Sequence, residues 1–147
     1  MSETVVLLGA IEMTKVRFET AKGVFEGTLE GEGIGAAIGK ALPIASTVMR
    51  WGDEIYFDVP VKMKNTKPTR DVRVGDIGYL PDGPCLCIFF GKTPASKADE
   101  PRPASDVTVV GRTDAPVDVL RAIKEGTAIT LERVTANCLL PDSPKPS

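Results

Sequence analysis

Short segments in which apolar and polar residues alternate, each bounded by turn-forming residues, recur along most of this chain of 147 residues. Val16 and Phe18 alternate with charged neighbours, and Ala21-Lys22-Gly23 favours a hairpin turn before the alternation resumes at Phe25. Many short strands at turn-rich intervals are typical of a closed barrel, which leaves no strand edge exposed. We therefore predict a mainly β fold, a closed β-barrel of about seven or eight short strands. The clearest strands are expected within 15–30 (a hairpin), 44–51, 54–59, 86–90, 107–111 and 127–134.

Two other segments show helical spacing. Apolar residues recur at intervals of three and four through Gly33–Leu42, which Pro43 ends. Asp114 can cap a second helix over Pro116–Glu125, closed by Gly126. Both helices are short, and we expect them to cap the open ends of the barrel.

The chain carries no internal repeat and no linker that would separate two domains. A chain of this length can bury the core of one domain without disulfides. We predict an N-terminal extension over 1–13 with room for one extra strand, a barrel over 14–134, and a disordered Pro-rich tail over 135–147.

Composition narrows the classes of partner. The formal net charge is −2, whereas nucleic-acid binding rests largely on basic surfaces. The apolar segment 4–11 is far shorter than the roughly 20 residues that span a bilayer, and it lacks the basic start of a signal peptide. We expect a cytoplasmic protein that binds neither nucleic acid nor membrane, with an oligomeric state that the sequence leaves open.

The chain contains no histidine, so neither a Ser-His-Asp triad nor an imidazole base can form. Cys85 and Cys87 would point to the same face of a strand, which suits packing better than bridging. With Cys138 they make three thiols, too few ligands for a typical zinc site without histidine. We expect no metal and no cofactor, and redox or metal chemistry at these thiols remains the minor alternative.

Gly31-Glu32-Gly33-Ile34-Gly35-Ala36 matches the glycine spacing of a dinucleotide-binding turn, and Asp53 lies about 20 residues downstream. The preceding strand, Val24–Glu30, alternates with charged residues, whereas the first strand of that fold is buried on both faces. Strand–helix units do not recur along the chain. We interpret the glycines as a turn into a helix.

Three motifs together resemble a known family. Trp51-Gly-Asp-Glu-Ile-Tyr-Phe, Val74-Gly-Asp-Ile-Gly-Tyr and Leu86-Cys-Ile-Phe-Phe-Gly-Lys-Thr-Pro-Ala-Ser are similar, in order and spacing, to small prokaryotic cyclophilin-like domains of unassigned function. The resemblance covers roughly Thr14 to Val134 and implies a compact eight-stranded barrel with two capping helices. True cyclophilins isomerise Xaa-Pro bonds with an Arg, a Gln and an aromatic-lined pocket. This chain has no Gln, and Arg50 lies near the strand equivalent to that of the catalytic Arg.

We predict one pocket at the barrel surface, formed by the hairpin Trp51–Tyr56 and the loop Phe90–Ser96. Glu54 and Tyr56 share one strand face, opposite a core face, and a carboxylate beside aromatic rings suits a ligand with an apolar body and a donor group. The alternative is that Glu54 is a solvated strand residue and the aromatic rings only pack. The candidate ligand-binding residues are Arg50, Trp51, Glu54, Tyr56, Tyr79, Phe89, Phe90, Thr93 and Ser96.

Two classes of function are consistent with these residues. The first is a binding module for a peptide or a small molecule, and the second is a peptidyl-prolyl isomerase with an altered, weak site. A hydrolase or lyase that uses Glu54 with Tyr56 or Tyr79 is a third class, but no nucleophile–base pair can be specified for it. An isomerisation assay on a proline tetrapeptide separates the first two classes.

Overall fold

The computed structural model describes residues 13–134. The predicted extra strand before residue 13 and the predicted tail from residue 135 lie outside the described residues. The elements are β1 (Met13–Thr20), β2 (Gly23–Glu30), α1 (Gly33–Ala41), β3 (Ile44–Thr47), β4 (Met49–Arg50), β5 (Glu54–Asp58), β6 (Asp76–Leu80), β7 (Cys85–Phe89), β8 (Thr108–Thr113), α2 (Val117–Arg121) and β9 (Ala128–Arg133).

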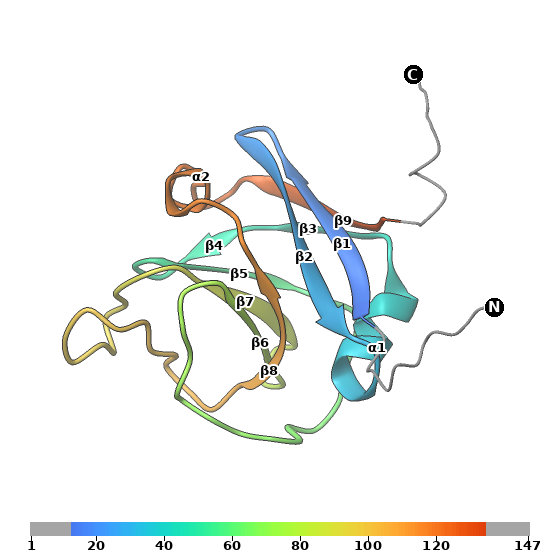
Figure 1. Cartoon of the computed structure of the whole chain (residues 1–147), viewed down its shortest axis with the longest axis horizontal. Coiled ribbons are helices and arrows are strands. Elements are labelled where there is room, and N and C mark those ends of the chain that lie inside the picture. The colour runs from blue at the N-terminus through green and yellow to red at the C-terminus, as the bar shows by residue number, and fades with distance from the viewer. Residues whose placement is uncertain (1–12, 135–147) are drawn as a thin grey trace.

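The nine strands form one antiparallel sheet in the order β3-β9-β1-β2-β8-β6-β7-β5-β4. The sheet curls until β3, at one end, reaches β5, which lies next to the other end. The Ser46 hydroxyl of β3 donates a hydrogen bond to the Asp58 carbonyl of β5 at 2.8 Å. The result is the predicted barrel, nearly closed, with α1 and α2 at opposite ends (Figure 1). None of the helices within residues 13–134 is long and apolar enough to cross a membrane.

The strand expected over 44–51 is two strands, and β6 was not among the seven strands named as clearest in the sequence, so the structure has nine. β3 pairs with β9 and β4 pairs with β5, and Val48 lies between them. The Val48 N–H donates to the Thr127 carbonyl at 2.8 Å, and the Gly126 N–H donates to the Val48 carbonyl at 2.8 Å. The backbone of Val48 is therefore bonded to the segment before β9, and not to β5, which pairs with β4. Helix α2 is also shorter than predicted: it ends at Arg121, whereas the sequence predicted a helix as far as Glu125.

The barrel interior holds the main hydrophobic core. Phe18 lies at its centre, stacked on Phe25 with ring centroids 4.7 Å apart and edge-on to Phe57 at 6.5 Å. A second cluster lies on the other face of the sheet and contains Cys87, Phe89 and their neighbours. All five residues of β7 are buried, so the predicted burial of this strand on both faces is confirmed.

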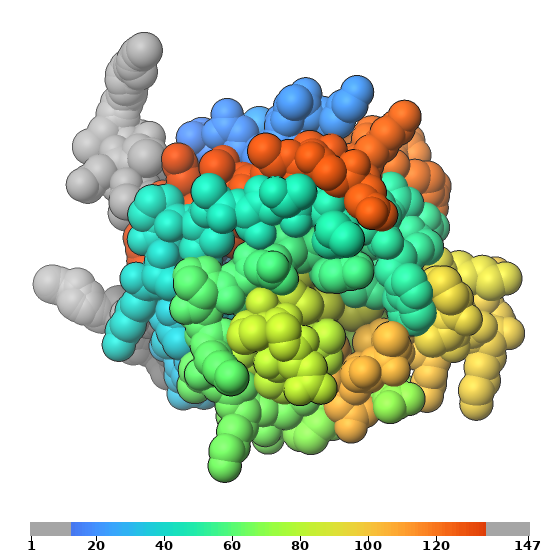
Figure 2. Space-filling model, turned by 180° about the vertical axis from the view of Figure 1, so that it is seen from behind, coloured from blue at the N-terminus to red at the C-terminus, as the bar shows by residue number. Residues whose placement is uncertain are grey.

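The irregular segment 103–107 covers that second face. Two backbone hydrogen bonds tie Val107 to Thr69, at 2.8 and 3.0 Å. Gly78 of β6 allows the close approach, because a Cβ there would lie 3.1 Å from the Val107 side chain. Figure 2 looks toward this side, where the covering segment, in orange, lies near the yellow-green residues between β6 and β7, although the two are far apart in the sequence.

Candidate functional site

A cavity of about 220 Å³ lies between the covering segment and the outer face of β5, β6 and β7. Three of the predicted site residues, Trp51, Glu54 and Tyr56, line it. We call this cavity the Glu54 pocket. The other lining residues are Leu80, Cys85, Cys87, Pro103, Ala104, Ser105 and Val107.

Strand register explains why these side chains meet. Tyr56 of β5 lies directly opposite Cys87 of β7, and Leu80 of β6 lies opposite Cys85. Residues directly opposite each other, and residues two apart in one strand, point to the same face of a sheet. Glu54 is two residues before Tyr56, so its carboxyl group faces the same cavity, as the alternation predicts.

Glu54 is nevertheless buried, with a residue exposure of only 5%. The alternation predicted the correct face for Glu54 but led us to expect that face to meet solvent, and the covering segment makes this part of the prediction wrong. Removal from water raises the pKa of the Glu54 carboxyl group to about 7, although a hydrogen bond with the Cys87 thiol opposes the shift. Within residues 13–134 no lysine or arginine forms an ion pair with Glu54.

Cys85 and Cys87 are free thiols, and both are buried, as the sequence predicted. Both side chains face the Glu54 pocket from one face of β7, and Glu54 of the neighbouring strand lines the same cavity. The hydrogen bond from Cys87 lowers the pKa of the Cys85 thiol, whereas the same bond and burial raise the pKa of Cys87. The sequence pattern indicated packing roles for both thiols and did not place them in the pocket, because no sequence signal pairs β7 with β5.

Trp51 and Tyr56 form the half-buried aromatic rim of the pocket. The Trp51 N–H donates to the Glu54 carbonyl at 3.0 Å, which closes the turn between β4 and β5. Burial raises the pKa of the Tyr56 hydroxyl, and the charge of Glu54 adds to the shift. The sequence predicted that these three residues share one pocket, and all three line the same cavity. It did not predict that Glu54 is buried.

The other aromatic candidates do not line the pocket. Tyr79 is fully buried in the main core, where its hydroxyl donates to the Val61 carbonyl at 2.7 Å and accepts from the Met63 N–H at 2.9 Å. Phe89 packs within the second cluster, and Phe90 belongs to the main core. All three therefore have packing roles in this structure.

Arg50 also lies outside the pocket lining, and its guanidinium group is fully engaged. It donates to the carbonyl groups of Arg121 and Ile123 at the end of α2, at 3.1 and 2.9 Å, and to the Gly52 carbonyl at 2.8 and 3.1 Å. It pairs with Asp53 at 3.6 Å. Arg50 thus connects the turn after β4 to α2, and this geometry does not support its comparison with the catalytic Arg of cyclophilins.

Thr93 and Ser96 use their hydroxyl groups inside their own loop. Thr93 donates to the Arg102 carbonyl at 2.6 Å, and Ser96 donates to the Glu100 carbonyl. The start of the loop packs against the turn after β4, because the Asp53 N–H donates to the Lys92 carbonyl at 2.9 Å. The expected pocket between the hairpin and the loop Phe90–Ser96 is therefore wrong in one wall, which the segment 103–107 supplies instead.

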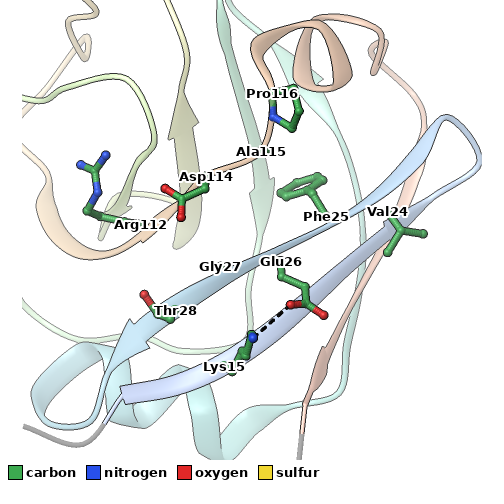
Figure 3. A pocket seen from close by; sticks show the side chains of 10 residues that line it. All are labelled: Lys15, Val24, Phe25, Glu26, Gly27, Thr28, Arg112, Asp114, Ala115 and Pro116. Carbon is green, nitrogen blue, oxygen red and sulfur yellow. Dashed lines mark ion pairs between the residues drawn. The ribbon is translucent and has the colours of Figure 1, made fainter. Parts of the chain in front are cut away.

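A larger cavity of about 640 Å³ lies between β2 and the chain that enters α2 (Figure 3). It is an open groove bordered by several charged side chains. Lys15 pairs with Glu26 at 3.3 Å, and Arg112 pairs with Asp76. Asp114 also lines the groove and forms no ion pair within residues 13–134, but it is exposed to solvent, whereas the carboxyl group of Glu54 is buried.

Comparison with known proteins agrees with the fold. A family model described as "Cyclophilin-like" matches residues 14–132. The solution structure of the hypothetical protein AF2241 from Archaeoglobus fulgidus is 36% identical in sequence, with a TM-score of 0.71, and the match covers 87% of this chain and 100% of that one. No curated protein matches the chain. With a family model matched over nearly all of the described residues, the chain belongs to the cyclophilin-like family.

Proposed function

We propose that this protein is a binding module whose Glu54 pocket takes a small ligand, or one side chain of a peptide, with an apolar body and an amino group. The observation that supports the proposal is the carboxyl group of Glu54. It is buried, it faces a cavity, and within residues 13–134 it has no cationic partner. Burying an unpaired carboxylate is unfavourable, and a ligand ammonium group removes that penalty.

The walls of the pocket suit the rest of such a ligand. Leu80, Pro103 and Val107 supply apolar surface, and the rings of Trp51 and Tyr56 can stack on an alkyl or cationic group. The volume of about 220 Å³ is below the roughly 300–1,000 Å³ of pockets for drug-sized molecules, so it favours a small ligand or a single side chain. The free thiols of Cys85 and Cys87 suit a reducing compartment such as the cytoplasm.

Titration with benzylamine tests the proposal, because benzylamine combines a ring with an ammonium group. Trp51 is the only tryptophan, so its fluorescence reports on the pocket directly. Benzyl alcohol, of nearly the same shape but uncharged, is the matched control. We expect benzylamine to bind at pH 8 at least about tenfold more tightly than the alcohol, the equivalent of a charged hydrogen bond.

Glu54→Gln should remove that preference, since the amide keeps the shape of the carboxyl group without its charge. Glu26→Gln, which neutralises a carboxylate of the larger groove, should leave it unchanged. Equal affinity for the amine and the alcohol in the unmodified protein would contradict the proposal. An effect of Glu26→Gln equal to that of Glu54→Gln would place the binding site in the larger groove.

A further inference from the structure

One side of β2 is open over half of its length. β2 pairs with β1 along the whole strand, but it pairs with β8 only at Gly27, Thr28 and Leu29. From Gly23 to Glu26, no strand within residues 13–134 pairs with this side, and the groove of about 640 Å³ lies there instead (Figure 3). An unpaired strand edge presents main-chain donors and acceptors, so it is a template for another extended chain.

The main-chain groups that face the groove belong to Val24 and Glu26. The Thr113 hydroxyl of β8 donates to the Glu26 carbonyl at 2.6 Å, so this carbonyl points toward the β8 side. Main-chain groups of alternate residues point to the same side of a strand, so the N–H and carbonyl of Val24 and the N–H of Glu26 point there too. In the described part of the chain, residues 13–134, none of these three groups has a hydrogen-bond partner. We call residues 24–26 the open edge.

The neighbouring elements limit what can lie along the open edge to about three residues. At one end, a Cβ on Gly23 would lie 3.3 Å from the Val119 side chain of α2. At the other end, a Cβ on Gly27 would lie 2.7 Å from the Arg112 carbonyl oxygen of β8. Both elements therefore reach β2, one on each side of the open edge. Three residues of a strand span about 10 Å at roughly 3.3 Å each, which is the length of a tripeptide in extended form.

The side chains around the open edge indicate which residues would fit it. Val24 is an apolar side chain with 53% exposure, which an apolar residue opposite it would cover. On the inner side, buried Phe25 and half-buried Ala115 leave space for a small residue only. The register of β2 with β8 places Asp114 across the groove from Glu26, and Asp114 forms no ion pair within residues 13–134. A basic residue opposite Glu26 would lie beside this carboxylate.

We propose that the groove binds an extended peptide segment of the pattern basic–small–apolar, which adds to the open edge of β2 as a short strand. Both neighbours of β2 are antiparallel to it, and the added segment takes the same direction. Its apolar residue lies opposite Val24 and exchanges two hydrogen bonds with it, and the carbonyl of its basic residue accepts from the Glu26 N–H. This site shares no lining residue with the Glu54 pocket, so it does not depend on the proposed function.

The acetylated tripeptide amide Lys-Ala-Val, titrated into the ¹⁵N-labelled protein and followed by NMR, tests the proposal. Binding should shift the amide signals of Val24 and Glu26 and slow the exchange of both amides with solvent. N-Methylation of the Val nitrogen of the peptide removes its donor to the Val24 carbonyl and should weaken binding at least about tenfold. N-Methylation of the Ala nitrogen, which points away from β2, is the matched control and should have a much smaller effect.

Asp114→Asn should weaken binding of this peptide by about two- to fivefold, the range of an exposed ion pair, and should not affect the analogue Gln-Ala-Val. Asp118→Asn, an exposed acid of α2 outside the groove lining, should change neither affinity. Equal effects of the two N-methylations, or no shift at Val24 and Glu26, would overturn the proposal. Slow exchange of both amides in the protein alone would also overturn it: the edge would then be covered by residues 1–12 or, if exchange depends on protein concentration, by a second copy of the chain.

Discussion

Glu54 and Cys87 lie on neighbouring strands of the barrel wall, and both side chains face the same cavity beneath a covering segment instead of meeting solvent. A carboxyl group in that position is protonated near neutral pH far more readily than one on the surface. The burial of Glu54 beside this cavity joins the acid–base behaviour of the protein to its candidate pocket, and it makes the stability of the fold depend on pH.

The stability of the protein should fall as pH rises from about 4.5 to about 7. In this range the unfolded state loses the Glu54 proton while the folded state keeps it, so the folded state binds more protons and loses stability with rising pH. The difference between the two pKa values corresponds to about 3 kcal/mol. The free energy of unfolding, measured with urea at pH 5 and at pH 8, should be lower at pH 8.

Glu54→Gln is the variant that isolates this contribution. It should be about as stable as the parent protein at pH 5 and more stable at pH 8, because the amide does not ionise. Glu26→Gln, on the surface beside Lys15, is the matched control and should follow the parent protein at both pH values. If Glu54→Gln were without effect at pH 8, Glu54 would not be buried as described.

Arg50→Ala should destabilise the protein by about 2–3 kcal/mol, because the carbonyl groups of Arg121 and Ile123 lose their charged donor. Arg50→Lys should recover part of this loss, since an ammonium group restores the charge but not the planar fork of donors. Thermal unfolding measures the stability of both variants. A stability equal to that of the parent protein for Arg50→Ala would show that these hydrogen bonds do not hold the turn after β4 against α2.

Prolyl isomerase activity should be close to background. The chain has no Gln and no His to orient a prolyl substrate, and the Arg50 guanidinium group is occupied by the protein itself. A tetrapeptide assay in which the protein is compared with a true cyclophilin at equal concentration measures this. Efficient isomerisation that disappears in a folded Arg50→Lys variant would contradict our assignment of Arg50 to a structural role.

Tyr79→Phe should cost about 1–3 kcal/mol, because the Val61 carbonyl and the Met63 N–H would lose a hydrogen-bond partner at the edge of the core. Tyr56→Phe is the matched control, since it removes a hydroxyl from the half-buried rim of the pocket and should change stability by under about 0.5 kcal/mol. Chemical denaturation of the two variants compares them, and equal losses would mean that the Tyr79 hydroxyl does not stabilise the segment it contacts.

Local pattern was enough to predict most of the strands and the faces of their side chains, although β6 was not among the expected strands. Alternation placed Glu54 and Tyr56 on one face, and the apolar run of β7 indicated burial on both sides. The covering segment could not be predicted, because 103–107 has no periodicity and is held by distant partners such as Thr69. The pairing of β7 with β5 is also non-local, so the meeting of Cys87 with Glu54 has no sequence signal.

The same reasoning explains the site residues that lie elsewhere. Thr93 and Ser96 were candidates because polar loop residues often contact ligands, but their hydroxyl groups satisfy carbonyl groups within the loop. Arg50 was a candidate through a family resemblance, and only the packing of α2 against the turn after β4 reveals what its guanidinium group binds. Whether a polar side chain binds a group of the protein itself or remains free for a ligand depends on tertiary structure.

The most direct test of the amine site is the titration of the Glu54 carboxyl carbon by NMR, with and without benzylamine. The titratable groups that face Glu54 are Tyr56, Cys85 and Cys87, and none of them supplies a positive charge. We predict a midpoint of about 7 in the free protein and a clearly lower midpoint with saturating benzylamine, because the ammonium group favours the carboxylate. Benzylamine affinity should accordingly increase with pH up to about 7 and then level off. A midpoint that benzylamine leaves unchanged would contradict the amine site.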